Sequence, residues 1–266
     1  MISPHLPRLL NMTYCLSLLC REGLVFVSDS RTSAGVDNIN IRPKMRVYAE
    51  EGARVLCLMT SGNLSLTQSV IALVEEDLLV AAKEPGRWNL LNQPTMFATA
   101  RYVGTKVREV DRMDRAALQA DGFSFNINIL VGGQIAGQEP EIHYVYPQGN
   151  SLKATHESPF LQIGESKYGK PILDRGFSYE TKLSDAVKFG LLSMEATMKS
   201  NVSVGPPLDV FAYETDSLSV KHRCRIQEGD AYLRQIQREW GNGIVKLVEA
   251  MPRFEFPAGE RGTAAT

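Results

Sequence analysis

Four short segments carry residues that could together hydrolyse an amide bond. Met12-Thr13-Tyr14-Cys15 places a threonine directly behind a methionine. If the chain begins at Met12 or is cleaved after it, Thr13 carries a nucleophilic hydroxyl and a basic α-amine on one residue. The other three segments are Val27-Ser28-Asp29-Ser30-Arg31, Arg42-Pro43-Lys44-Met45 and Thr60-Ser61-Gly62-Asn63. Each is common alone, so the prediction rests on their order along the chain.

These residue types suit an N-terminal threonine mechanism. A neutral hydroxyl is a poor nucleophile, so the α-amine of Thr13 would take its proton, directly or through a water. An ammonium at Lys44 would favour the neutral amine, and Asp29 would keep Lys44 charged and oriented. The backbone N–H of Gly62 would donate to the oxyanion of the tetrahedral intermediate. A plainer alternative stays open, in which these are an ordinary strand threonine, a turn cap and a solvated lysine.

The cysteines and histidines give weaker candidates. Cys15 could rival Thr13 as the nucleophile, but no base lies beside it in the sequence. The cysteines lie in or next to apolar runs and lack Cys-x-x-Cys spacing, which is typical of reduced thiols in a cytoplasmic protein. The histidines are scattered and form no metal motif. We therefore expect a cytoplasmic protein that needs no cofactor or metal.

Composition narrows the class of protein further. The chain has 266 residues, of which 44% are hydrophobic and 22% charged, enough for one domain with a large core. Its net charge of -1 gives no reason to expect a nucleic-acid partner. No run approaches the ~20 apolar residues of a membrane span. The sequence has no ATP-binding loop, so any unfolding ATPase would be a separate partner.

Hydrophobic patterning predicts alternating groups of strands and helices. Apolar runs predict strands at 13–19, 24–28, 45–48, 55–59, 123–132, 142–146, 160–163, 208–213 and 218–223, with a polar stretch at 32–43. Spacing of three and four predicts helices at 64–82, 94–118, 170–176, 184–199 and 226–249. Hairpins favour antiparallel sheets, and the paired helices favour layers on their outer faces. We therefore expect an α+β fold, as a four-layer αββα sandwich.

The ends of the chain differ from its middle. Residues 1–11 contain two prolines and lack a long apolar core, so we interpret them as a leader or an unused upstream start. Residues 12–257 would form a single domain, with a C-terminal helical extension from about 226. Residues 258–266 would be a disordered tail.

Several motifs in order resemble one known family. The segments are Met-Thr-Tyr-Cys, Leu24 to Asn38, Thr60 to Gln68, Ile163 to Pro171 and Ser200 to Pro207. They are similar to Anbu, a family of bacterial proteasome-related peptidases, from about Thr13 to Leu247. The resemblance implies the fold of the N-terminal-nucleophile hydrolases and a threonine peptidase acting on peptides or unfolded proteins. It also implies a homo-oligomer with an open helical or lock-washer arrangement.

The resemblance assigns roles to individual residues. Thr13 matches the nucleophile, Asp29 the buried acid, Lys44 the cation and Gly62 the oxyanion glycine. Where proteasome β-subunits have serine followed by glycine, this chain has Gly164-Glu165-Ser166, so either Glu165 or Ser166 could fill that place.

The segment containing Ser203 also departs from the proteasome pattern. Proteasome β-subunits have Asp-x-x-Ser-Gly, whereas this chain has Ser200-Asn201-Val202-Ser203-Val204-Gly205 and lacks the auxiliary carboxylate. This departure keeps two alternatives open. The first is a catalytically weak assembly or binding protein that retains the fold. The second is an amidohydrolase of a small non-peptide amide.

Overall fold

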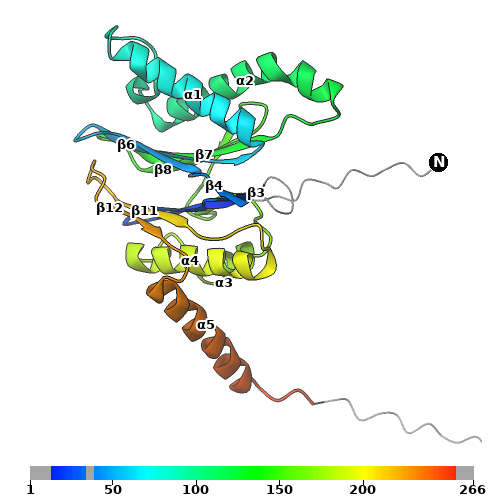
Figure 1. Ribbon diagram of the computed structural model, residues 1–266. Helices are drawn as coiled ribbons and strands as arrows, with labels where there is room; N and C mark the ends of the chain where they lie inside the picture. Colours follow the sequence, from blue (N-terminus) through cyan, green and yellow to red (C-terminus); the bar gives the residue numbers. More distant parts are fainter. Residues whose placement is uncertain (1–12, 34–38, 256–266) are drawn as a thin grey trace, which may run out of the picture.

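The computed structural model describes residues 13–33 and 39–255 (Figure 1). The expected leader at 1–11 and tail at 258–266 lie outside these residues. One five-stranded antiparallel sheet has the order β10-β1-β2-β11-β12. Its strands are β1 (Tyr14–Cys20), β2 (Gly23–Asp29), β10 (Phe160–Gly164), β11 (Leu208–Glu214) and β12 (His222–Ile226). Every residue of β1 and β2 is buried, so the sheet places the start of β1 and the end of β2 deep in the protein.

A second five-stranded antiparallel sheet faces the first. It has the order β5-β6-β7-β8-β9. Its strands are β5 (Met45–Glu50), β6 (Arg54–Gly62), β7 (Ile127–Ile135), β8 (Glu141–Val145) and β9 (Ser151–Lys153). A short hairpin of β3 (Arg31–Ser33) and β4 (Ile39–Ile41) connects the two sheets at one end.

Helices cover the outer face of each sheet. The pair α1 (Leu64–Ala81) and α2 (Met96–Ala120) packs on the sheet of β6, β7 and β8, with a short 3-10 helix, η1 (Leu90–Asn92), between them. The pair α3 (Lys170–Gly176) and α4 (Leu183–Ser200) packs on the sheet of β1, β2 and β11. Figure 1 shows this succession of helices, two sheets and helices. Helices together with two antiparallel sheets confirm the expected α+β class.

The inner faces of the two sheets meet in an apolar layer. Phe26 of β2 and Phe211 of β11 stack there, with ring centroids 5.8 Å apart. Gly132 of β7 lies against the ring of Phe26, and a Cβ at Gly132 would come within 2.6 Å of it. Glycine at this position therefore lets the facing sheet approach, because no other residue leaves room for the ring.

The last strand and the last helix begin later than the sequence predicts. A strand was expected at 218–223, but Asp216 and Leu218 have positive φ and extend the turn after β11, so β12 begins at His222. The helical extension was expected from about 226, but Ile226 still pairs with Leu208. The helix α5 (Ala231–Glu249) begins only where the Asp230 side chain accepts from the N–H of Leu233.

Three further differences concern the presence or the bounds of strands. The polar stretch at 32–43 contains the hairpin partner β4, and β9 follows β8 although 151–153 has no alternating pattern. The strand expected at 123–132 begins at Ile127 and runs to Ile135.

None of the described helices has the length and apolar character needed to cross a membrane.

Candidate active site

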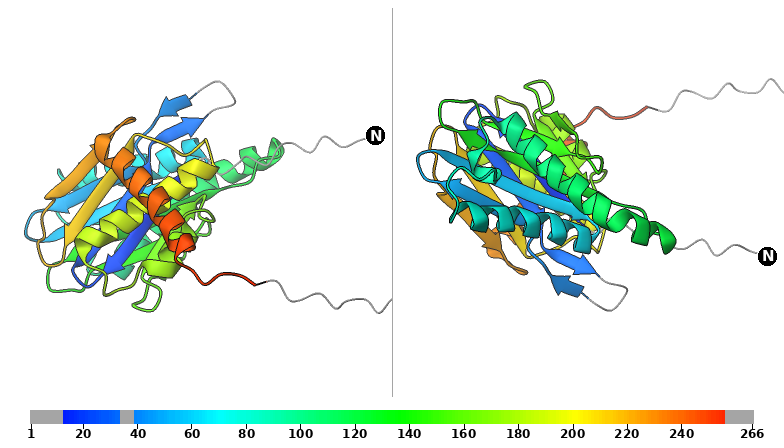
Figure 2. Two further views of the ribbon diagram at one scale, coloured as in Figure 1. Left: turned by 90° about the horizontal axis from the view of Figure 1, so that it is seen from below. Right: turned by 90° about the horizontal axis from the view of Figure 1, so that it is seen from above.

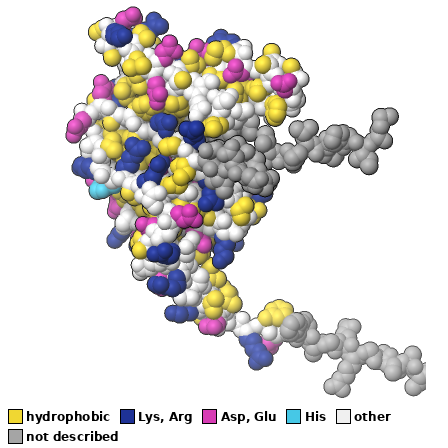
Figure 3. All heavy atoms as spheres, viewed as in Figure 1, with side chains coloured by type: hydrophobic (Ala, Val, Ile, Leu, Met, Phe, Trp, Pro, Cys, Tyr) yellow, Lys and Arg dark blue, Asp and Glu magenta, His cyan; other side chains and the backbone are white. Residues whose placement is uncertain are grey.

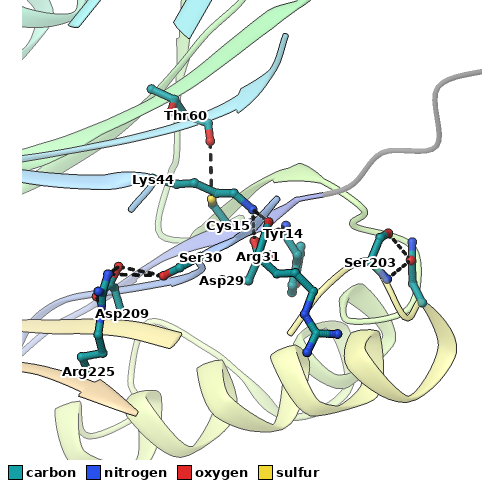
Figure 4. Close-up of polar contacts among 11 residues, drawn as sticks. Tyr14, Cys15, Asp29, Ser30, Arg31, Lys44, Thr60, Ser203, Asp209 and Arg225 are labelled. Carbon is teal, nitrogen blue, oxygen red and sulfur yellow. Dashed lines mark hydrogen bonds and ion pairs between the residues drawn. The ribbon is translucent and has the colours of Figure 1, made fainter. Parts of the chain in front are cut away.

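A buried ion pair lies where the two sheets and the β3–β4 hairpin meet. Asp29, at the end of β2, has no exposed surface, and Lys44, just before β5, is 8% exposed. The Lys44 Nζ donates to Asp29 Oδ1 at 2.7 Å and to the carbonyl oxygen of Arg31 at 2.6 Å (Figure 4). The main chain of Lys44 is held as well, because its carbonyl accepts from the N–H of Thr60 on β6. The ammonium therefore has a fixed position between the two sheets.

The peptide bond that follows Thr13 is held on both sides. The N–H of Tyr14 donates to Asp29 Oδ1 at 3.0 Å, so one carboxylate oxygen binds both this amide and Lys44. On the other side, the carbonyl of Thr13 accepts from the N–H of Glu165 at 2.8 Å. Gly164 allows this approach: it has a φ of 84°, and a Cβ there would lie 1.9 Å from the Thr13 carbonyl oxygen. The backbone of Thr13 is thus fixed beside the ion pair.

The charge of Asp29 depends on its neighbours. Burial raises the pKa of Asp29, because the ionised carboxylate loses water. The Lys44 ammonium opposes this rise in pKa most strongly, and the backbone N–H groups of Tyr14 and Gly205 also oppose it. Removing Lys44 would therefore leave a buried carboxyl that favours its protonated form.

The turn that contains Gly62 ends β6 and begins α1. Gly62 has a φ of 111°, and a Cβ there would lie 2.4 Å from the carbonyl oxygen of Asn126. The next residue, Asn63, caps the helix by accepting from the N–H groups of Ser65 and Leu66. The positive end of an 18-residue helix therefore lies directly beside Gly62, which favours a negative charge at this place.

The thiol of Cys15 is poorly suited to act as a nucleophile. Cys15 is fully buried in β1, and its Sγ donates to the carbonyl of Thr60 at 3.8 Å (Figure 4). Burial raises the pKa of the Cys15 thiol, while the coulombic effect of Lys44 lowers it less. The thiolate, which is the reactive form, is therefore disfavoured.

The loop after β10 and the loop after α4 are joined by a side-chain network. Glu165 is 6% exposed, and its Oε2 accepts from the side-chain amide of Asn201 at 3.2 Å. The amide oxygen of Asn201 accepts from the backbone N–H of Ser203 at 3.0 Å and from its hydroxyl at 2.5 Å. Ser166 is not part of the network: its backbone closes the turn into α3, and its hydroxyl makes no hydrogen bond to the described residues. Of these two residues, Glu165 is the one whose side chain is hydrogen-bonded to another described residue.

A second ion pair supports the end of β2 from the other direction. Arg225 of β12 donates from Nε to Asp209 Oδ1 at 2.8 Å and from a terminal nitrogen to Oδ2 at 2.9 Å. Ser30, next to Asp29, donates its hydroxyl to Asp209 Oδ2 (Figure 4). Sequence reasoning missed this pair, because its members lie 16 residues apart on antiparallel strands. The only sign of this ion pair in the sequence was the acidic residue Asp209 inside the apolar run 208–213.

The structure brings most of the predicted site residues into one region. Asp29 and Lys44 are in direct contact, and Asp29 holds the amide next to Thr13. Gly62 lies two residues after Thr60, and the backbone N–H of Thr60 donates to the carbonyl of Lys44. Ser203 belongs to the network that begins at Glu165, and only the Ser166 hydroxyl stays apart. Among residues 13–33 and 39–255, no group of three or more His, Cys, Asp or Glu side chains is placed to hold a metal ion.

Solved structures similar to this chain are known. No family model matches the sequence, and no curated protein matches it. Anbu (ancestral β-subunit) from Yersinia bercovieri is 41% identical, with a TM-score of 0.84, and the match covers 92% of this chain and 100% of that one. Anbu from Hyphomicrobium sp. strain MC1 is 39% identical, with a TM-score of 0.83 and the same coverage. The helical assembly of the Anbu complex from Pseudomonas aeruginosa is 42% identical, with a TM-score of 0.84, covering 91% and 98%.

Proposed function

The chain belongs to the Anbu family of ancestral proteasome β-subunits, and from this premise we propose that it is an N-terminal threonine peptidase. It would hydrolyse peptide amide bonds in the cytoplasm, within a homo-oligomer. Its two sheets and outer helices would be the four-layer αββα sandwich of the N-terminal-nucleophile hydrolases. The observation that carries the proposal is that one oxygen of Asp29 binds both the Lys44 ammonium and the amide next to Thr13.

The proposed reaction begins with the free α-amine of Thr13. The unperturbed pKa of an α-amine is about 7.7–8.0, and a nearby ammonium lowers it by disfavouring a second positive charge. Lys44 is the proposed ammonium, and its ion pair with Asp29 fixes its position. The neutral amine accepts the proton of the Thr13 hydroxyl as Oγ attacks the substrate carbonyl carbon. The amine then returns a proton to the leaving nitrogen, which leaves an ester on Thr13 for water to hydrolyse.

The oxyanion of the tetrahedral intermediate would bind at the turn after β6. The backbone N–H of Gly62 is the proposed donor, and the capped N-terminus of α1 adds a favourable field. Losing one such donor costs about 3 kcal/mol of transition-state stabilisation in other hydrolases. Only glycine adopts the backbone conformation at residue 62 without strain and without contact to Asn126.

We expect hydrolysis only from chains that begin at Thr13. A preceding residue turns the α-amine into an amide, which cannot accept a proton at working pH. The test compares two preparations, one that begins at Thr13 and one that retains residues 1–12, on a peptide library read by mass spectrometry. Intact-mass measurement before and after the assay checks whether the longer chain has been cut.

The same comparison separates the alternatives when small non-peptide amides are added to the set of substrates. Hydrolysis by material whose intact mass still includes residues 1–12 would contradict the mechanism. Absence of cutting by both preparations favours the catalytically weak assembly or binding protein. Cutting of small non-peptide amides, with all library peptides intact, favours the amidohydrolase.

The last helix supports the proposal that the protein self-assembles. The first turns of α5 pack on α4 through Leu233 and Ile236, and Figure 2 shows the helix crossing over the α3–α4 layer. The helix then continues past the end of that layer (Figure 1), and apolar side chains lie on this part of it (Figure 3). Ile244, Leu247 and Val248 of α5 are exposed apolar residues on the same side of the helix as Leu233 and Ile236. Apolar surface of this kind is typical of a protein interface, and a second copy is the proposed occupant.

Acidic residues on the apolar side of α5 should weaken the assembly. We expect the double variant Leu247→Asp and Val248→Asp to form a smaller species, because each substitution places a carboxylate in a buried contact. The control is Gln235→Asp with Asn242→Asp, which adds the same charge on the opposite side of the helix. Light scattering at micromolar concentration measures the mass of both. A wild-type chain that stays monomeric, or a control that dissociates equally, would contradict the proposal.

A further inference from the structure

The network of Glu165, Asn201 and Ser203 has a fixed direction of hydrogen bonding. An ionised carboxylate can only accept, so the group of Asn201 that faces Glu165 must be its NH₂. The backbone N–H of Ser203 can only donate, so it must face the amide oxygen of Asn201. The opposite orientation of the amide would place two donors together and two acceptors together. Glu165 and the Ser203 backbone therefore select the same orientation of Asn201.

This orientation also determines what the hydroxyl of Ser203 can do. The amide oxygen of Asn201 only accepts, so the Ser203 hydroxyl donates its single hydrogen to that oxygen, at 2.5 Å. The lone pairs of the Ser203 oxygen then remain as acceptors. An α-amine has N–H donors and needs its own lone pair for the reaction. A neighbouring group that only accepts can bind such an amine without competing for that lone pair.

The network begins at the residue that holds Thr13. The backbone N–H of Glu165 donates to the Thr13 carbonyl, so Glu165 contacts Thr13 through its main chain and Asn201 through its side chain. The loop of Ser203 is fixed from the other side, because Arg31 donates to the carbonyl of Val202 at 2.9 Å. Arg31 also accepts from Lys44, so this loop is connected to both sides of the proposed site.

We propose that Glu165 and Asn201 are positioning residues that hold the Ser203 hydroxyl as an acceptor for the α-amine of Thr13. This inference rests on the proposed function, in which that amine is the base. The carboxylate of the network belongs to Glu165, which lies on a different loop from Asn201 and Ser203. The groups that face Glu165 are Asn201 and the Lys167 ammonium, which lies 3.8 Å from Oε1 and is largely exposed.

Exchanging the two side chains tests the direction of the network. Asn201→Asp puts a carboxylate against Glu165, which breaks their contact unless the pair shares a proton. Adding Glu165→Gln to that variant restores one donor and one acceptor, with the charge moved to position 201 and Ser203 still bonded to an acceptor. Glu165→Leu serves as the control that removes the contact without adding a charge. The two readouts are the unfolding midpoint and the rate at which a peptide epoxyketone labels Thr13.

We expect Asn201→Asp to slow labelling at least tenfold at about pH 8, because the two carboxylates repel. Its unfolding midpoint should fall as well. Both deficits should shrink as the pH falls towards about 5, because adjacent carboxylates share a proton with a raised pKa. The double variant should recover to within about threefold of the wild-type rate and lose this pH dependence, whereas Glu165→Leu should be slow at every pH.

Two results would overturn the inference. One is an Asn201→Asp variant that labels and unfolds like the wild type. The other is a double variant that unfolds no later than Asn201→Asp alone. If wild-type Thr13 is never labelled but the double variant recovers its unfolding midpoint, the orientation of the network stands and the proposed peptidase function fails.

Discussion

Replacing Thr13 by alanine is expected to abolish peptide hydrolysis and to leave the fold intact. The substitution removes the only hydroxyl that also has an α-amine, and losing a nucleophile costs roughly a thousandfold or more in turnover. The contacts that hold this residue involve its carbonyl and the N–H of Tyr14, neither of which the substitution removes. The measurement is the rate of peptide cutting by wild type and Thr13→Ala in parallel, with the unfolding midpoint as a check on folding.

Two further variants make this test specific. Thr13→Ser keeps the hydroxyl and should retain activity, whereas Cys15→Ser should change activity little because the Cys15 thiol is buried. Hydrolysis by Thr13→Ala at the wild-type rate, together with loss in Cys15→Ser, would show that the nucleophile has been assigned to the wrong residue.

Replacing Lys44 by methionine is expected to have the second largest effect. Without the ammonium the α-amine of Thr13 holds its proton to higher pH, so the rate at neutral pH should fall by roughly a hundredfold. Stability should fall too, because removing one partner of a buried ion pair costs about 3–5 kcal/mol. Methionine retains the apolar stem of lysine, so packing contributes little to either change.

The pH dependence of this loss has a definite sign. Burial raises the pKa of Asp29 in the folded chain, and removing Lys44 raises it further. A carboxyl with a higher pKa in the folded state stabilises that state below its unfolded pKa, about 3.9, and loses this effect as pH rises through the folded pKa. Denaturant titrations should therefore show that Lys44→Met loses stability relative to wild type as pH rises from about 4 towards 7.

A second substitution isolates the cause of this loss. Adding Asn at position 29 removes the unpaired charge, so Asp29→Asn with Lys44→Met should be more stable at neutral pH than Lys44→Met alone, yet equally inactive. A Lys44→Met chain whose stability deficit is constant across this pH range would contradict the role given to Asp29.

The sequence predicted the elements whose patterns are local. The helices covering the outer faces have apolar residues every three or four positions, so α1, α2 and α4 lie close to their predicted bounds. The two opening hairpins have turn signals between apolar runs, and they form as expected. The turn after β11 was not predictable, because Leu218 adopts a positive φ that its residue type disfavours.

The candidate site was only partly accessible from the sequence. Asp29 and Lys44 were predicted as partners, and they are in contact. The contributions of the Tyr14 and Glu165 N–H groups and of the Arg31 carbonyl could not be foreseen, because almost every residue type carries these groups and only the fold places them. Glu165 and Asn201 lie 36 residues apart on two loops, so their contact has no periodic signal either.

The peptide bond after Thr13, held by Asp29 on one side and Glu165 on the other, has a consequence for the timing of activation. These two contacts use the carbonyl of Thr13 and the N–H of Tyr14, so both can form whether or not the chain continues before Thr13. Folding and activation are then separate events: the first sets the geometry, and the second changes only one functional group. Cutting before Thr13 would switch on the chemistry without a rearrangement, and the delay before activity would measure the cutting step alone.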